Sequence, residues 1–287
     1  MRIGIYFDLS IFATQNNVVY KCNIDGCDLD MKKRVELFTV TRNRRINNEY
    51  IVLYAKPDGK LPDISPGEFV EIKVENGPNT FLRRPISIHE VNKDTNEMLL
   101  LIQEVGEGTR LLVGLQPGDK LDLIYPLGNS FTLPKQGKML LVGGGVGVAP
   151  LLILGRRLRE EGAEVNFLLG ARNREILMDL TDYKQYGTIG VTTEDGSAGV
   201  KGYVTDHPLL KERLKDMDRV YTCGPDAMMR AVAAAAKGAG IACEVSLENM
   251  MACGFGACLC CVVETKSGNK NTCTEGPIFN IEDLKGW

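Results

Sequence analysis

The stretch Glu248–Phe279 reads ENMMACGFGACLCCVVETKSGNKNTCTEGPIF and decides the fold of the C-terminal part of the chain. Four of its cysteines follow the spacing C-x4-C-x2-C-x11-C, namely Cys253, Cys258, Cys261 and Cys273. This is the plant-type spacing for a [2Fe–2S] cluster, which is held by four thiolates. The first three thiols belong to one short loop and the fourth follows a predicted hairpin. We therefore expect the loop to wrap around an iron–sulfur core.

The glycines of the loop support this interpretation. Gly254 and Gly256 give the backbone the freedom and close approach that a tight wrap requires, and free N–H groups can then point at the cluster sulfurs. One alternative is a structural zinc site, but such sites usually have two short cysteine pairs and only one is present here. Another is a set of buried structural cysteines. Cys260 is a surplus thiol that we expect to be a packed bystander.

Composition limits the classes of protein that need to be considered. The chain has 287 residues, of which 44% are hydrophobic and 25% charged, and this length allows two or three domains. A net charge of -3 argues against a nucleic-acid partner. Nine cysteines, four of them clustered, indicate metal or redox use in a reducing, cytoplasmic compartment. No run of 18 apolar residues occurs, so we expect no membrane partner.

The first 30 residues differ from the rest of the chain. Polar residues interrupt their weakly apolar pattern, and they lack the basic region and cleavage site of a signal peptide. Met31 resembles an alternative start, since the regular pattern begins directly after it. We expect residues 1–30 to be a poorly packed extension that a chain beginning at Met31 does not need for folding.

Residues 31–135 are rich in predicted strands, separated by Gly, Pro, Asn and Asp turn signals. Six short strands at this spacing predict a small antiparallel barrel, with one short helix near Gly108–Val113. The predicted strands are Val35–Thr41, Tyr50–Ala55, Phe69–Val74, Pro85–Val91, Met98–Gln103 and Lys120–Ile124.

Residues 136–246 change to alternating strands and helices, which predicts a parallel sheet covered by helices on both faces. The predicted strands are Met139–Val142, Val165–Leu169, Ile189–Thr192, Arg219–Thr222 and Ile241–Ser246. Amphipathic and alanine-rich segments predict helices that end near Glu161 and Lys237. Residues 247–287 then form a small cluster domain.

Two turns in the second region point to a nucleotide. Gly143–Pro150 is a glycine-rich strand-to-helix turn, which can place a helix N-terminus against a pyrophosphate. It does not match G-x-G-x-x-G, so a packing turn is the alternative. Cys223-Gly224-Pro225 ends another strand, at the edge where ligands bind in such sheets.

Two further motifs lie in the barrel region. Arg84-Pro85-Ile86-Ser87 offers a guanidinium for a pyrophosphate and a hydroxyl for a flavin edge. Gly106-Glu107-Gly108-Thr109 opens the short helix and offers N–H groups. His89 points to the same barrel face as Ser87, and we expect a surface or packed histidine there. His207 precedes a proline and is expected in a solvated turn.

The order of these motifs is more specific than any one of them. A barrel with R-P-I-S, then G-G-G-x-G-x-A-P, then C-G-P, is similar to the ferredoxin–NAD(P) reductase family of flavoproteins over about residues 34–246. The added segment, with MACGFGACLCC and CTEGPIF, resembles the electron-transfer subunits of type B dihydroorotate dehydrogenases. This second resemblance extends over nearly all of the chain from Met31 to the C-terminus.

The resemblance implies a set of site residues. Those implied to bind FAD are Arg84, Pro85, Ile86, Ser87, Leu101, Ile102, Gln103, Gly108 and Thr109. Those implied at the nicotinamide site are Gly144, Gly145, Gly147, Cys223, Gly224 and Pro225, with Ser87 and Cys223 as the catalytic pair. The loop Thr193-Glu194-Asp195-Gly196 resembles the family's nucleotide loop, and Arg172 and Arg174 could contact a 2′-phosphate.

The resemblance also implies a partner. A separate FMN subunit would oxidise dihydroorotate, and this chain would pass electrons through the [2Fe–2S] cluster and FAD to NAD⁺ within a heterotetramer, in pyrimidine biosynthesis. One alternative is a subunit that feeds ferredoxin, sulfide or glutamate-synthase chemistry, some of which have aspartate where Cys253 stands here. An alternative from another class is a redox-sensing or zinc-stabilised interaction module.

Overall fold

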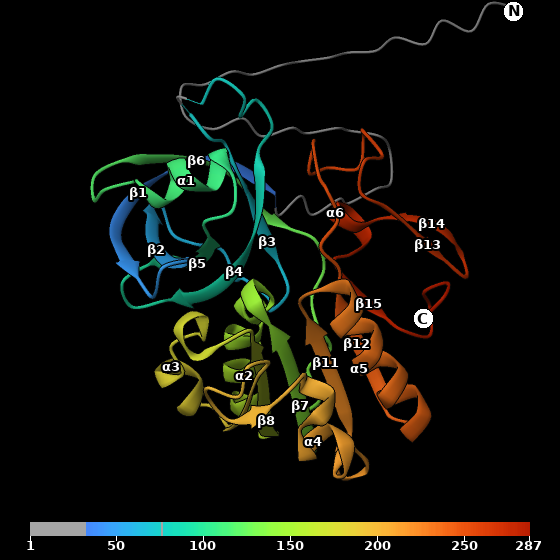
Figure 1. Cartoon of the computed structure of the whole chain (residues 1–287). Helices are drawn as coiled ribbons and strands as arrows, with labels where there is room; N and C mark the ends of the chain where they lie inside the picture. The colour runs from blue at the N-terminus through green and yellow to red at the C-terminus, as the bar shows by residue number, and fades with distance from the viewer. Residues whose placement is uncertain (1–32, 76) are drawn as a thin grey trace, which may run out of the picture.

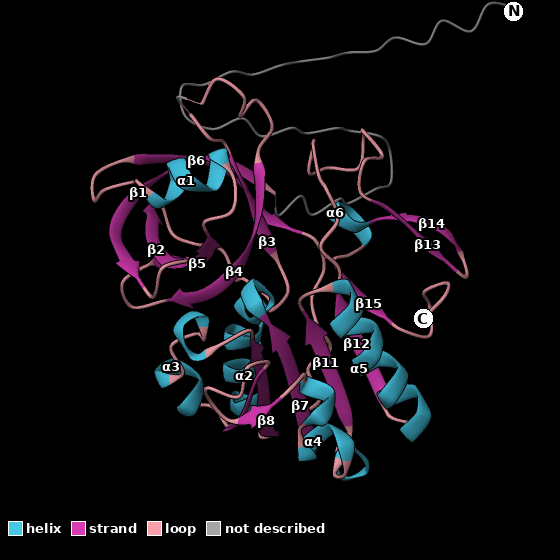
Figure 2. Ribbon diagram, in the orientation of Figure 1, coloured by secondary structure: helices cyan, strands magenta, loops and turns pink. Residues whose placement is uncertain are grey.

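The computed structural model describes residues 33–75 and 77–287. It contains a closed barrel, a seven-stranded sheet and a two-stranded hairpin. Figures 1 and 2 show the barrel above the large sheet, with the C-terminal segment beside both. The predicted extension, residues 1–30, lies outside the described residues. No helix in the described part is long and apolar enough to cross a bilayer.

The barrel confirms the predicted six antiparallel strands. Its strand order is β1-β2-β5-β4-β3-β6, so chain neighbours β3 and β4 pair while β6 closes the sheet between β1 and β3. The short helix α1 lies between β5 and β6. The elements are β1 (Arg34–Arg45), β2 (Tyr50–Pro57), β3 (Phe69–Ile72), β4 (Arg84–Asn92), β5 (Glu97–Gln103), α1 (Glu107–Val113) and β6 (Lys120–Leu127).

The second unit is a sheet of order β10-β9-β8-β7-β11-β12-β15. Its first six strands are parallel, as predicted. The elements are β7 (Lys138–Gly144), η1 (Gly145–Val148), α2 (Ala149–Glu160), β8 (Glu164–Ala171), η2 (Arg174–Ile176), α3 (Thr181–Lys184), β9 (Thr188–Thr193), β10 (Val200–Lys201), η3 (Val204–Asp206), α4 (Pro208–Lys211), η4 (Leu214–Asp216), β11 (Arg219–Cys223), α5 (Asp226–Ala239) and β12 (Ala242–Ser246).

Alternation along the buried strands directs their side chains to two helical layers. Leu141 packs with residues of α2, whereas its neighbours Leu140 and Val142 pack with residues of α5. The α5 helix ends at Gly240, which adopts the left-handed conformation (φ 71°) that suits glycine at this position. The sheet is therefore covered on both faces.

The C-terminal segment contains β13 (Val262–Thr265), β14 (Gly268–Asn271), α6 (Thr272–Glu275) and β15 (Ile278–Asn280). Strand β15 pairs antiparallel with β12 and adds an edge to the large sheet. Phe279 and Leu284 are buried in the same core as α5. The sequence predicts a separate segment after residue 246 and does not predict its contribution to the sheet, because a three-residue strand carries too little pattern.

Packing joins the barrel to the sheet through α2. Ile153 of α2 belongs to the core of the barrel. The ring of His89 in β4 is buried and its Nδ1–H donates to the carbonyl oxygen of Ala149 at 2.9 Å. Burial lowers the pKa of His89, which keeps the ring neutral and suited to this role. His89 is thus a packed histidine that connects the two units.

An ion pair strengthens the same junction. Arg156 of α2 donates to both carboxylate oxygens of Glu90 in β4, at 3.0 and 2.8 Å, and both side chains are mostly buried. Such a bidentate ion pair is stronger than a surface ion pair, because its geometry is fixed and solvent is largely excluded.

We predict that Arg156→Ala lowers the free energy of unfolding by about 2–3 kcal/mol, since it leaves the Glu90 carboxylate largely buried without its partner. Lys93→Ala is the matched control. Lys93 pairs with Asp63 at 3.1 Å, but both side chains are more than 60% exposed, so its loss should change stability by no more than about 0.5 kcal/mol. Urea unfolding of the two variants measures the difference, and equal losses would contradict the assignment.

Candidate functional site

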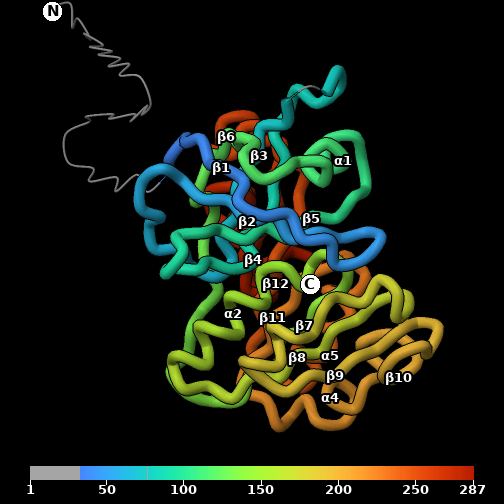
Figure 3. The backbone as a smooth tube through the Cα atoms, turned by 90° about the vertical axis from the view of Figure 1, so that its left-hand side faces the viewer, coloured from blue at the N-terminus to red at the C-terminus, as the bar shows by residue number. Residues whose placement is uncertain are grey.

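The cluster loop begins directly after β12 and returns to the barrel. Its apolar support is a small buried group made of Phe69 of β3, Leu127 of β6, Met251, Cys261 and Cys273. The outer face of the barrel therefore carries two of the four predicted cluster ligands. Figure 3 shows the C-terminal segment behind the barrel in the turned view.

Backbone geometry in the loop agrees with the prediction from the glycines. Gly254 and Gly256 have φ values of 72° and 84°, the left-handed region that disfavours side chains. Leu259 shares this conformation with φ 57° despite its side chain. The turns direct amide groups inward: the N–H of Cys258 donates to the Cys253 sulfur and that of Cys273 to the Cys261 sulfur, each at 3.4 Å.

The electrostatics of the thiols fit a thiolate-held core. Burial pushes the pKa of the Cys253 thiol upward, but the N–H groups of Phe255 and Cys258 outweigh this and lower it to about 7. Burial raises the pKa of the Cys273 thiol to about 12, and its hydrogen bond with Cys261 adds to the rise. The Cys253 thiol is thus prepared for deprotonation, whereas the Cys273 thiol requires a metal to remove its proton.

The four thiols interact with one another. Hydrogen bonds connect Cys253 with Cys258 and Cys261 with Cys273, and the Cys273 thiol also interacts with Cys253. No set of three or more histidine, cysteine or carboxylate side chains in the described residues converges on a single ion position. A [2Fe–2S] core has two irons and takes its four thiolates from the whole loop, so this donor set fits such a core.

One prediction about a neighbouring residue needs correction. Cys260 is exposed and is not a packed bystander. Met251 is buried, whereas Met250, Phe255 and Leu259 are exposed by 81, 59 and 62%. Three of the four apolar residues around the cysteines therefore face solvent.

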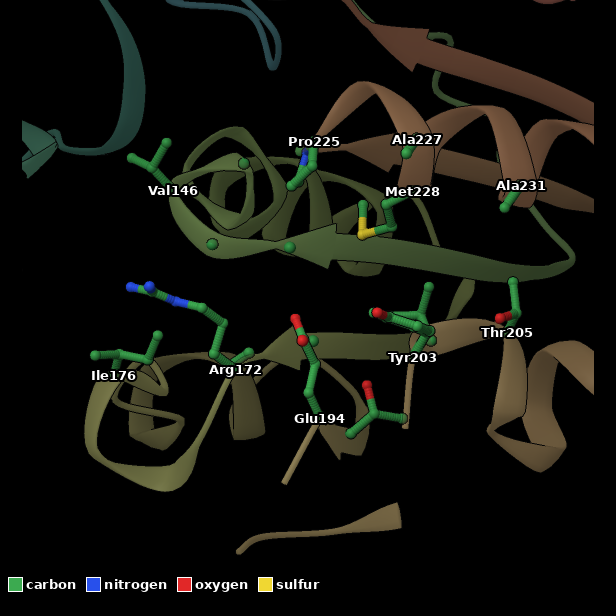
Figure 4. A pocket seen from close by; sticks show the side chains of 18 of the residues that line it. Val146, Arg172, Ile176, Glu194, Tyr203, Thr205, Pro225, Ala227, Met228 and Ala231 are labelled. Atoms are coloured by element: carbon green, nitrogen blue, oxygen red, sulfur yellow. The ribbon is translucent and has the colours of Figure 1, made fainter. Parts of the chain in front are cut away.

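A pocket of about 790 Å³ opens at the carboxyl ends of the parallel strands. Figure 4 shows Arg172, Glu194 and Tyr203 reaching into it from one side and Pro225 and Met228 from the other. Of the predicted site residues, those that line it are Gln103, Gly144, Gly145, Gly147, Arg172, Glu194, Gly224 and Pro225. The position at the strand ends is where nucleotides bind in such sheets.

Close packing explains the glycines of the pocket. A Cβ atom on Gly147 would lie 2.4 Å from the carbonyl oxygen of Cys223 and from Gly224, so the turn after β7 can meet the end of β11 only without a side chain. Gly145 has φ 57° and lies beside the hydroxyl of Tyr50 from the barrel. The two predicted turns therefore contact each other at the carboxyl edge of the sheet.

Cys223 lies behind the pocket wall. Its side chain is fully buried and its thiol lies 3.9 Å from Oε1 of Glu248. Burial raises the pKa of Cys223 well above its usual value, and the nearby Glu248 adds to this effect. Glu248 is open toward the pocket, yet the surrounding protein desolvates its carboxyl and raises its pKa also. The thiol is therefore protonated and serves as a donor, not a nucleophile.

Some of the predicted flavin residues of the barrel lie at the short helix α1, and others lie within the buried cores. Arg84 and Gly108 touch, since a Cβ atom on Gly108 would lie 2.6 Å from Nε of Arg84. Thr109 uses its hydroxyl to accept from the N–H groups of Val105 and Gly106. Leu101 and Ile102 are buried in the two cores, so only their backbone can face a cofactor.

Several residues of the pocket were not predicted from the sequence. Tyr50 and Glu248 line it from other units of the chain, and Glu49 of the barrel accepts from Arg172 at 2.6 Å and from Gln103 at 2.9 Å. No local motif marks these residues, because the fold brings them together from distant positions.

The barrel and parallel sheet define a class of protein, the ferredoxin-reductase-like flavin- and nucleotide-binding oxidoreductases. The structure of an NADH-dependent reduced ferredoxin–NADP oxidoreductase is similar with a TM-score of 0.78 and 28% identity, over 86% of this chain and 89% of that one. A cytochrome P450 reductase from Amycolatopsis has a TM-score of 0.63 and 25% identity, over 72 and 66%.

Family models and curated relatives are more specific. Residues 248–285 match the iron–sulfur cluster binding domain of dihydroorotate dehydrogenase B, and residues 141–234 match the oxidoreductase NAD-binding domain. The electron transfer subunit of dihydroorotate dehydrogenase B (NAD(+)) from Fusobacterium nucleatum is 35% identical, over 88% of this chain and 99% of the relative. That from Caldanaerobacter subterraneus is 36% identical, over 85 and 96%.

The chain belongs to the family of electron transfer subunits of dihydroorotate dehydrogenase B (NAD(+)). It is an oxidoreductase subunit of flavin and iron–sulfur electron transfer with FAD, a [2Fe–2S] cluster and NAD as its cofactors. As an electron transfer subunit it works with a catalytic partner.

We predict that only the four spaced cysteines hold the cluster. Anaerobically purified protein should contain about two irons and two acid-labile sulfides per chain. Replacing Cys253, Cys258, Cys261 or Cys273 by serine should remove most of this iron. Cys260→Ser is the matched control and should retain it, because that thiol is exposed and unpaired with the other four. Loss of iron in Cys260→Ser, or stoichiometric zinc in place of iron, would contradict the ligand set.

Proposed function

We propose that this chain receives electrons from the FMN of a dihydroorotate-oxidising subunit and delivers them to NAD⁺. The route leads from the [2Fe–2S] cluster to FAD and then to the nicotinamide. The complex is a cytoplasmic heterotetramer that serves pyrimidine biosynthesis. The chain's own residues bind, space and shield the three redox groups, and the acid–base chemistry on dihydroorotate belongs to the partner.

The observation that carries this proposal is the position of β3. Phe69 of β3 pairs with Ser87 of the predicted flavin motif on one side. The same residue packs with Cys261 and Cys273 of the predicted cluster loop on the other. A single strand thus separates the two redox sites. Cross-strand neighbours lie about 5 Å apart, so this arrangement supports direct electron transfer between them.

The nucleotide pocket supplies the third redox site, next to those of the flavin and the cluster. Tyr50 and Gln103 of the barrel line it together with the glycines after β7, which supports a nicotinamide facing the flavin side of the barrel. FAD supplies the exchange between a two-electron hydride and single electrons when it is bound. Glu248 lines the pocket beside this position, and the buried thiol of Cys223 lies behind it.

Charges in the pocket favour NAD⁺ over NADP⁺. Glu194 directly follows β9 and has its carboxylate in the pocket, where it can accept from a ribose hydroxyl but would repel a 2′-phosphate. Arg172, the residue that sequence analysis considered for a 2′-phosphate, is paired with Glu49 at 2.6 Å. The positive charge of Arg172 is therefore already compensated by Glu49.

The partner surface includes the exposed apolar residues of the cluster loop. Met250, Phe255 and Leu259 surround the predicted ligands, and exposed apolar residues that gather in this way are typical of docking surfaces. Docking here would place the partner's flavin close to the cluster and would exclude water from the gap between them.

The isolated chain should oxidise NADH with artificial dyes and show no dihydroorotate oxidation. Adding the FMN subunit should create NAD⁺-dependent dihydroorotate oxidation, measured as NADH absorbance under anaerobic conditions. We predict that Phe255→Asp lowers this coupled rate at least tenfold and leaves dye reduction nearly unchanged.

Leu37→Asp is the matched control, because Leu37 is a similarly exposed apolar residue (55%) on β1 of the barrel. It should leave both rates nearly unchanged. Dihydroorotate turnover by the isolated chain would contradict the division of labour. Equal loss of dye reduction and coupled rate in Phe255→Asp would contradict the docking surface.

A further inference from the structure

Glu49 of the barrel contacts the nucleotide-binding unit beside the pocket. It lies in the turn just before β2, and its carboxylate accepts from the guanidinium of Arg172, which follows β8, at 2.6 Å. Arg172 lines the pocket, and so does Tyr50, the neighbour of Glu49 in the chain. This ion pair therefore joins the barrel to the parallel sheet at the edge of the nucleotide site.

The position of Glu49 is fixed by several hydrogen bonds. Its second carboxylate oxygen accepts from Nε2 of Gln103 at 2.9 Å. Its backbone N–H donates to Oδ1 of Asn47 at 2.9 Å, and its carbonyl oxygen accepts from the N–H of Glu104 at 2.8 Å. The side chain of Glu49 is 27% exposed, whereas that of Arg172 is 64% exposed. Glu49 is thus the fixed member of the pair, and the long side chain of Arg172 has the rotational freedom to take another partner.

Glu194 offers a second carboxylate next to Arg172. The N–H of Glu194 donates to the carbonyl oxygen of Ala171 at 3.2 Å, and that of Asp195 to the carbonyl oxygen of Arg172 at 3.3 Å. The two side chains therefore start from neighbouring backbone positions. In Figure 4 the guanidinium of Arg172 points away from the carboxylate of Glu194, and its ion pair is with Glu49. Glu194 thus keeps its negative charge in the pocket.

The charge beside the ribose decides which nucleotide the pocket accepts. Like charges repel, so an unpaired carboxylate at this place disfavours a phosphate on the 2′ oxygen. A guanidinium there does the opposite, because arginine forms charge-assisted hydrogen bonds with phosphate. Both groups are present in this pocket, as Glu194 and Arg172, and Glu49 determines where the second one lies.

We propose that Glu49 is a positioning residue that sets the nucleotide specificity of the pocket, because it holds Arg172 on the barrel side, away from Glu194 and from a 2′-phosphate. Without the charge of Glu49, Arg172 is free to pair with Glu194 or with the extra phosphate of NADP⁺, and either contact weakens the preference for NAD⁺. The selecting residue thus lies in the barrel, although the sheet binds the nucleotide. This inference rests on the proposed function, in which Glu194 faces the ribose.

The test compares the dissociation constants of NAD⁺ and NADP⁺ with the full, FAD-loaded chain by isothermal titration calorimetry. Glu49→Gln keeps the shape of the side chain and removes its charge. The preference for NAD⁺ over NADP⁺ should fall about fivefold at low salt, the scale of an exposed ion pair. The fall should be smaller at high salt, since solvent ions screen the exposed Arg172. The ratio of kcat/KM for NADH and NADPH in dye reduction should change in the same direction.

Glu104→Gln is the matched control. Glu104 lies close to Glu49 in the barrel and its loss changes the net charge equally, but its carboxylate pairs with Arg45 at 3.1 Å. Its nucleotide preference should stay near that of the parent chain. The double variant Glu49→Gln/Arg172→Gln should also return to the parent preference, since the released guanidinium is gone. A purely structural role of Glu49 would weaken both nucleotides equally. An unchanged preference in Glu49→Gln, or a fall that persists in the double variant, would overturn the proposal.

Glu49→Ala is made alongside, since glutamine can still accept a hydrogen bond from Arg172. It should lower the preference at least as much as Glu49→Gln does. Failure of both variants to retain FAD would mean that Glu49 serves assembly of the barrel and would overturn the specificity role. The outcome is separable from the proposed function: a parent chain that prefers NADP⁺ would refute the assignment of NAD⁺, whereas a parent that prefers NAD⁺, with no change in either variant, refutes only this inference.

Discussion

The contact of the cluster loop with the outer face of β3 is the constraint on which the rest of the structure depends. Phe69 supports the ligands Cys261 and Cys273, and Gly254 lies on Glu71 with no room for a side chain. The loop therefore cannot leave the barrel without exposing an apolar group and a buried carboxyl. This contact fixes the distance between the cluster site and the flavin motif on the next strand.

The remaining connections maintain that distance. Strand β15 attaches the C-terminal segment to β12 of the large sheet, while His89 and the Arg156–Glu90 pair attach the sheet to the barrel. The barrel, the large sheet and the C-terminal segment therefore each contact the other two. Electron transfer rates fall steeply with the distance between redox groups. An arrangement that holds the cluster, flavin and nicotinamide sites at fixed distances is therefore well suited to a relay. The solvent-exposed side of the cluster loop remains free for a partner.

Sequence patterns predicted the barrel, the parallel sheet and the cysteine loop because each is encoded locally. Alternating strands, glycine turns such as Gly143–Pro150 and the cysteine spacing are all short-range signals. The exposure of Cys260 and the edge strand β15 were not predicted, since they depend on which surface the C-terminal segment contacts. Glu71 reads as an ordinary strand residue in sequence, and only the fold reveals that a cluster loop covers it. The assignments of Ser87 and the other flavin-binding residues remain predictions.

The order in which NADH reduces the flavin and the cluster is the most direct test of the relay. NADH can be mixed anaerobically with the isolated chain, with flavin absorbance followed by stopped flow and the cluster by freeze-quench electron paramagnetic resonance. If FAD lies between nicotinamide and cluster, flavin bleaching precedes the cluster signal, and the cluster signal grows only after flavin has been reduced. A cluster signal that develops before flavin bleaching, or in chain depleted of FAD, would contradict the account.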